Sequence, residues 1–136
     1  MRREKSKFVA LHPALRDEAI IVEDGTRELA MAAERTLRRF GKRIIGQQFI
    51  PRRLADVLID LYTLSCVMAR VHTEIVDGGA EKAARQIEIA HALGRQVRRR
   101  VRDNFAQLDD NEDDLLKALA DDAFEAERFR WDNLAR

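Results

Sequence analysis

Apolar residues recur every three to four positions along most of this chain, which is the period of one face of an α-helix. Glycine, proline and charged residues divide this pattern into four segments, expected at about 13–40, 42–76, 80–108 and 109–134. Alternation of apolar and polar residues never lasts long enough to predict a strand. We therefore predict an all-α fold, an antiparallel up-and-down bundle of about four helices joined by short loops.

The first segment begins at Pro13, a residue suited to a first helical turn, and is expected to end at Gly41. The run 24–26, Asp-Gly-Thr, predicts a break, after which Thr26 would cap a second helical piece. The apolar face of that piece is expected to hold Leu29, Ala33, Leu37 and Phe40.

The second segment is the longest, and its wide apolar face predicts the central helix of the bundle. This face is expected to hold Leu54, Leu58, Leu61, Ser65, Met68 and Ile75, widened by Val57, Leu64 and Val71. Pro51 has no amide donor, so it should kink this helix or split it near residues 47–50. Cys66 is the only cysteine, so no intramolecular disulfide is possible, and we expect it to be a small buried hydrophobe.

The last two segments differ in character. The third carries one regular apolar face, consisting of Ala83, Ile87, Ala90, Gly94, Val97, Val101, Phe105 and Leu108. Its small residues would let a neighbouring helix approach closely. The fourth opens with the acidic block 109–114, because carboxylates are favoured at the positive end of a helix dipole. Its apolar face is more mixed and holds Leu116, Leu119, Ala120, Ala123, Phe124, Glu127, Trp131 and Leu134.

The length of 136 residues suits a single helical domain, with residues 1–10 expected as a flexible or irregular lead-in. The 25 basic and 24 acidic residues leave a net charge of +1, which argues against a simple polyanion binder. No run approaches the roughly 20 apolar residues of a membrane span. The basic start 1–7 is not followed by the apolar core of a signal peptide, so we expect a cytoplasmic protein.

Glu88 and His91 form a Glu-x-x-His, the local motif of di-iron sites in helical bundles. Such a site needs a second copy of the motif, and neither His12 nor His72 follows a glutamate at that spacing. Nucleophile elbows, phosphate-binding glycine loops and Cys-x-x-Cys pairs are also absent from the sequence. We therefore expect neither a metal site nor catalytic residues.

Two charged groups remain as candidates for contacts. Asp56 can be neutralised by Arg52 and Arg53 one turn earlier, whereas Asp60 has no such neighbour and should pair with another helix or another chain. A dense cluster of arginines, at 95, 98, 99, 100 and 102, could instead contact phosphates. Its simpler interpretation is a solvated helix end that faces the acidic block 109–114, and the absence of interleaved aromatic residues disfavours nucleic acid.

Six short motifs follow one another between Leu11 and Val71. They are His12-Pro13-x-Leu15, Gly41-Lys42-x-Ile44-Ile45, Gln48-Phe49, Arg53-Leu54-Ala55-Asp56, Ile59-Asp60-Leu61-Tyr62 and Val67-Met68-Ala69-Arg70. In order and spacing this stretch resembles the C-terminal helical domain of the very-long-chain-type acyl-CoA dehydrogenases and their bacterial relatives. It departs from that pattern at Pro51, where a polar residue is usual, and at Met68-Ala69, where the family has Leu-Ser. Beyond Gly79 the chain fits the family only in general character.

The resemblance implies a non-catalytic accessory or assembly domain of fatty-acid metabolism, packing against a dehydrogenase body or against itself as a homo-oligomer. FAD and the catalytic glutamate of that family lie in the body, so no catalytic or cofactor-binding residue is carried over to this chain. The residues expected to make the contacts are Arg53, Asp56, Asp60 and Tyr62. The alternative is a stand-alone anion-binding module that uses Arg95, Arg98, Arg99 and Arg102 for CoA phosphates or nucleic acid.

Overall fold

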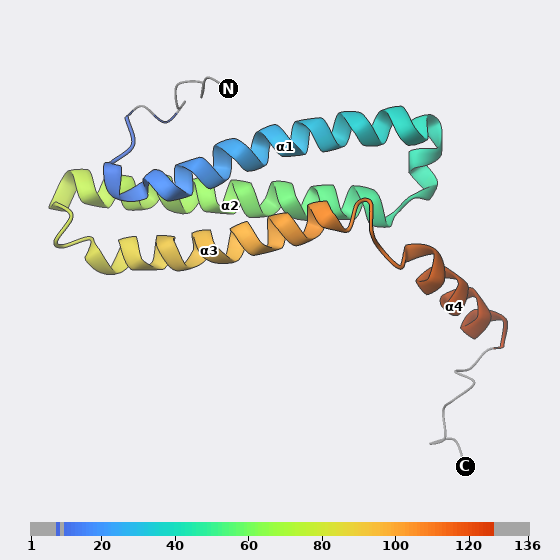
Figure 1. Ribbon diagram of the computed structural model, residues 1–136. Coiled ribbons are helices and arrows are strands. Elements are labelled where there is room, and N and C mark those ends of the chain that lie inside the picture. The colour runs from blue at the N-terminus through green and yellow to red at the C-terminus, as the bar shows by residue number, and fades with distance from the viewer. Residues whose placement is uncertain (1–7, 9, 127–136) are drawn as a thin grey trace, which may run out of the picture.

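The computed structural model describes residue 8 and residues 10–126, and the regular elements of this part are all helical (Figure 1). Three long helices lie side by side and antiparallel, α1 (Arg16–Phe40), α2 (Phe49–Gly78) and α3 (Ala84–Ala106). Two 3₁₀ turns, η1 (Pro13–Leu15) and η2 (Gly41–Gly46), precede α1 and α2, and α4 (Asp113–Glu125) follows α3. The predicted all-α class is confirmed.

Buried side chains from the three long helices form the core. The larger group includes Val57, Leu61, Leu64 and Met68 of α2 and Val97 and Val101 of α3. A second group, Leu15, Val71, Ile75, Ala83 and Ala90, closes the end where α2 turns into α3. The face predicted for α3 is confirmed, since all its members are buried except Ile87, which is half-buried.

The predicted break at residues 24–26 is wrong, because α1 continues through Gly25. Gly25 is buried, and a Cβ atom at this position would lie 2.7 Å from Cδ2 of Leu61. The glycine therefore serves the close approach of α1 to α2, not a turn. The predicted apolar face of α1 is confirmed in part, since Leu29 and Phe40 pack against the core. Leu37 is 58% exposed, and Ala32 and Thr36 are buried instead.

Pro51 stands in the first turn of α2, where its missing amide leaves no intrahelical hydrogen bond unmade. Residues 41–46 form η2 and do not join α2. The split expected near residues 47–50 is thus observed, and Pro51 lies in the first turn of α2 instead of kinking a longer helix.

α4 stands clear of the other three helices (Figure 1). None of its residues is buried, in contrast to each of the long helices. The three long helices therefore form the packed bundle, and the predicted fourth helix is present but outside it. Glu127, Trp131 and Leu134, expected on its apolar face, lie outside the described residues, as does most of the lead-in 1–10. Among the described helices, none has the length and apolar character needed to cross a membrane.

Replacing Gly25 by valine should lower the free energy of unfolding by about 1–3 kcal/mol, because the new side chain would overpack against the buried Leu61. The matched control is Gly46→Val, since a Cβ at Gly46 meets no atom within 4 Å. We expect the control to change stability by less than about 0.5 kcal/mol. Urea denaturation followed by circular dichroism measures both, and equal losses would contradict the close-approach role of Gly25.

Candidate docking surface

α2 carries a second apolar face on the side turned away from the core. Its members are Ala55, Leu58, Ile59, Tyr62, Cys66 and Ala69, all of them exposed, and we call this set the outer α2 face. Three large side chains dominate it, with Leu58, Ile59 and Tyr62 exposed by 57%, 60% and 70%. A contiguous apolar face of this kind on a protein surface marks an interaction site.

Two residues of the outer α2 face correct expectations from the sequence. Leu58 was expected in the core and Cys66 was expected to be buried, yet both are exposed. At 100° per residue, Leu58 lies about 100° and Cys66 about 180° around the helix from the buried Val57. They therefore belong to the outward side of a helix that is apolar on two sides.

Arg53 links α2 to the first residue of α4. Its guanidinium donates to both carboxylate oxygens of Asp113, at 2.5 and 2.7 Å, and its Nε donates to Gln107 at 3.4 Å. The two charged side chains are only 13% and 16% exposed. The hydrogen bonds from Arg53 hold the pKa of the Asp113 carboxyl below its usual value and raise the pKa of Arg53. Asp56, expected beside Arg52 or Arg53, has Arg52 as its partner, 3.9 Å away on the surface.

Asp60 pairs with Arg100 of α3, so its partner belongs to another helix of the same chain. Arg100 donates to the Asp60 carboxylate at 2.6 and 2.8 Å, and Asp60 is 14% exposed. This hydrogen bond raises the pKa of Arg100 above its usual value. The pair fixes the rotation of α2 relative to α3 and thereby helps to orient the outer α2 face.

A family model described as "ACAD9/ACADV, C-terminal domain" matches residues 13–129. The chain belongs to this family. The family resemblance read from residues 11–71 is therefore confirmed, and the match extends it through α3 and α4.

Two curated relatives support this assignment. The very long-chain specific acyl-CoA dehydrogenase, mitochondrial, of Rattus norvegicus is 28% identical over 101 residues, which are 74% of this chain. Its Mus musculus counterpart is 28% identical over 98 residues, 72% of this chain. The matched region is 15% of the length of either relative. Both relatives are named as mitochondrial, so the cytoplasmic location expected for this chain stays a prediction.

The arginine cluster of this ACAD9/ACADV C-terminal domain does not converge on one point. Arg100 turns to Asp60 of α2, whereas Arg98 and Arg102 line a groove between α1 and α3. Arg102 also contacts its neighbour Asp103, at 3.3 Å. Arg95, Arg98 and Arg99 are exposed and make no ion pair within the described part of the chain.

Sequence reasoning missed the pair between Glu18 and His91. Glu18 is 3% exposed, and its Oε1 lies 2.8 Å from Nδ1 of His91 on α3. Gly94 makes room for it, because a Cβ there would lie 3.1 Å from the Glu18 side chain. The signal was present, since Glu18 falls between Leu15 and Val22 on the buried face of α1.

The Glu-x-x-His motif is thus divided between two unrelated contacts. Glu88 pairs with Arg85 at 3.0 Å on the surface of α3, while His91 turns to Glu18. His72 accepts a hydrogen bond from the backbone amide of His12 at 3.2 Å. No group of three or more potential metal ligands occurs in the described ranges.

Replacing Arg53 by methionine should return the pKa of Asp113 towards its usual 3.8, because the hydrogen bonds that lower it are lost. The folded-state pKa of Asp113 lies below its unfolded value. The pair therefore contributes its full stabilisation above pH 3.8 and loses it as the pH falls through the folded-state pKa. Carboxyl chemical shifts of Asp113, followed by NMR against pH, measure the change. Arg52→Met is the matched control, and an unshifted Asp113 in Arg53→Met would contradict the pairing.

Reversing the charge at Asp60 with arginine should lower the free energy of unfolding by about 2 kcal/mol, because Arg100 would then face a like charge. Asp103→Arg should cost less than about 0.5 kcal/mol, since Asp103 is 60% exposed. Urea denaturation compares the two variants. The double variant Asp60→Arg with Arg100→Asp should recover part of the loss, and equal losses for Asp60→Arg and Asp103→Arg would contradict the role of the pair.

Proposed function

We propose that this chain is the accessory helical domain of an FAD-dependent acyl-CoA dehydrogenase of fatty-acid oxidation, and that it docks on the dehydrogenase body through the outer α2 face. The observation that carries this proposal is that α2 is apolar on two opposite sides. A helix that is hydrophobic nearly all round is a buried helix. α1 and α3 cover one side of α2, and the dehydrogenase body would cover the other.

The family supports this choice of partner. The two curated relatives are named as very long-chain specific acyl-CoA dehydrogenases, and this chain corresponds to 15% of the length of either. In the proposal, FAD and the reacting acyl-CoA belong to the dehydrogenase body, and no residue of this chain is assigned to them. The chain would contribute packing surface and subunit organisation.

Within the docking surface, Tyr62 is the residue that would contribute most. It lies near the middle of the outer α2 face and is 70% exposed, so a partner could bury most of its ring. Its hydroxyl group would remain at the polar edge of the contact, as is common for tyrosine at interfaces. The pairs made by Arg53 and Asp60 would act indirectly, by holding α2 in place.

The anion-binding alternative keeps one observation in its favour. Arg95, Arg98 and Arg99 have no acidic partner in the described part of the chain. However, Arg100 pairs with Asp60, and the groove that Arg98 and Arg102 line does not include Arg95 or Arg99. Binding that falls steeply with salt concentration would support this alternative, whereas docking through an apolar face would depend little on salt.

The docking proposal predicts that the immobilised chain retains a larger polypeptide with flavin absorbance from a lysate of its own cells. Leu58→Asp should lower the retained flavin by about tenfold or more, because it places a charge in the apolar contact. Ile45→Asp is the matched control, since Ile45 is 84% exposed in η2 and outside the outer α2 face. Retention without flavin, or an equal loss in the control, would contradict the proposal.

A further inference from the structure

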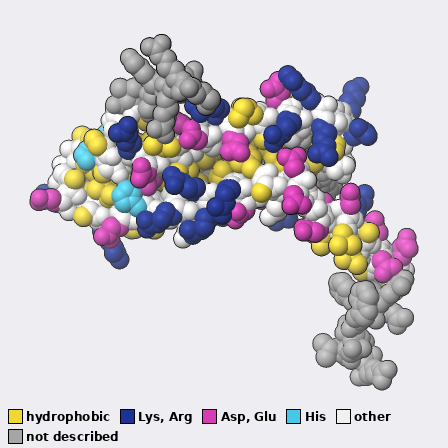
Figure 2. Space-filling model, viewed as in Figure 1, with side chains coloured by type: hydrophobic (Ala, Val, Ile, Leu, Met, Phe, Trp, Pro, Cys, Tyr) yellow, Lys and Arg dark blue, Asp and Glu magenta, His cyan; other side chains and the backbone are white. Residues whose placement is uncertain are grey.

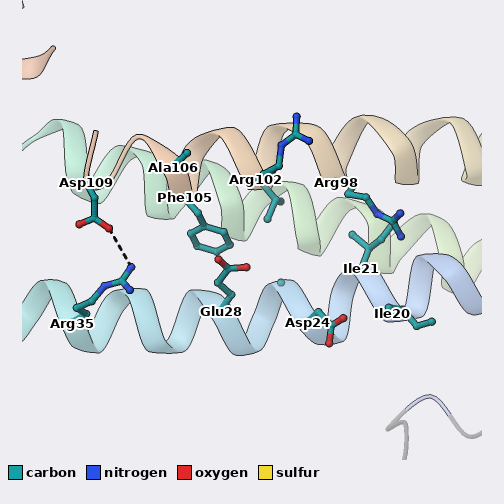
Figure 3. Close-up of a pocket in the computed structure, with 12 residues that line it drawn as sticks. Ile20, Ile21, Asp24, Glu28, Arg35, Arg98, Arg102, Phe105, Ala106 and Asp109 are labelled. Carbon is teal, nitrogen blue, oxygen red and sulfur yellow. Dashed lines mark ion pairs between the residues drawn. The ribbon is translucent and has the colours of Figure 1, made fainter. Parts of the chain in front are cut away.

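A groove runs between α1 and α3 on the side of the bundle away from the outer α2 face (Figure 3). Its volume is about 600 Å³, and buried or half-buried apolar residues, among them Ile21, Val101 and Phe105, line it. Arg98 and Arg102 stand on its α3 rim, and acidic residues, Asp24 and Glu28, stand on its α1 rim. An ion pair between Arg35 and Asp109, at 3.8 Å, crosses one end.

α4 has an exposed apolar face. Leu116, Leu119 and Phe124 are exposed by 52%, 48% and 84%, and Figure 2 shows hydrophobic side chains gathered on this helix. Isolated helices of about this length, 13 residues, are marginally stable in water. The amphipathic pattern therefore indicates a helix that packs against another surface.

The α3 rim of the groove is opposite in charge to α4, and the groove and α4 are similar in length. α4 has five acidic residues and one basic residue, a net charge of −4. The α3 rim of the groove carries Arg98 and Arg102, although the lining as a whole is balanced, with three arginines and three acidic residues. The 13 residues of α4 make a helix about 20 Å long. The groove follows α1 from Ile20 to Arg35, which is about 22 Å at the same rise per residue.

The α4 of the same chain is held away from this groove. Its first residue, Asp113, is bound by Arg53 of α2. Arg53 lies on the edge of α2 that faces α3, as does Asp60, which pairs with Arg100. From this anchor α4 continues outward beyond the end of the bundle (Figure 1). A helix that leaves its own bundle while a matching groove stays open is the arrangement expected of an element exchanged between copies.

We propose that α4 of one copy occupies the α1–α3 groove of a second copy, and that the exchange is reciprocal. Each half of the resulting dimer is then a four-helix bundle with one helix supplied by its partner. The apolar side of α4 covers Ile21, Val101 and Phe105, and its acidic residues approach Arg98. This interface goes beyond the proposed docking function, because it uses neither the outer α2 face nor a dehydrogenase body.

Sedimentation velocity of the full 136-residue chain tests the exchange. The chain should be a dimer, and Leu116→Asp combined with Leu119→Asp should raise the dimer dissociation constant by about tenfold or more. The three-helix core should keep its helical circular dichroism, since α4 contributes no buried residue. Leu58→Asp should leave the dimer intact, so that a failure of this inference is distinguished from a failure of the docking proposal. A monomeric wild-type chain, or a dimer lost only in Leu58→Asp, would overturn the inference.

Disulfide trapping decides which chain supplies the helix. Two Cys66→Ser chains, one carrying Glu28→Cys on the groove rim and the other Asp121→Cys on α4, should form a mixed disulfide dimer on mild oxidation. Glu34→Cys replaces Glu28→Cys as the matched control, because Glu34 is an exposed glutamate of α1 that does not line the groove. Equal trapping with the control would overturn the inference. A single chain carrying both Glu28→Cys and Asp121→Cys that closes only on itself would also overturn it, because α4 would then fill its own groove.

Discussion

The rest of the structure depends on how closely α1 approaches its two neighbours. Gly25 lets Leu61 of α2 press against the α1 backbone, and Gly94 of α3 leaves room for the buried side chain of Glu18. Because a glycine stands at each contact, α1 can approach α2 closely at Gly25 and α3 closely at Gly94. A three-helix core results, and it leaves two surfaces unpaired, the outer α2 face and the α1–α3 groove.

Three cross-helix contacts then set the orientation of these surfaces. Asp60 and Arg100 join α2 to α3, Glu18 and His91 join α1 to α3, and Arg53 with Asp113 joins α2 to α4. Apolar packing alone tolerates rotation of one helix against another, whereas a bidentate hydrogen-bonded pair has one geometry. Arg53 and Asp60, two of the residues that the sequence predicts to make contacts, therefore help to align the helices.

The helical segments and the core face of α3 could be predicted from the sequence, because α3 is apolar on one side only and its period is unambiguous. The core face of α2 is harder to predict, because α2 is apolar on two sides. Periodicity alone assigns Leu58 to the core side, whereas Leu58 lies on the exposed side. Gly25 was taken for a break because a local pattern does not distinguish a turn from a close helix contact. Arg53 and Asp113 are 60 residues apart, so no local spacing rule could join them.

The outer α2 face and the α1–α3 groove lie on opposite sides of the same bundle, since α2 lies behind the groove (Figure 3). They can therefore be occupied at the same time without competing for side chains. If a dehydrogenase body covers the outer α2 face of each copy, exchange of α4 brings two such bodies together through their accessory domains. The link between them would be a 13-residue helix anchored at Asp113, so the Arg53 guanidinium would control how that helix is presented to the second copy.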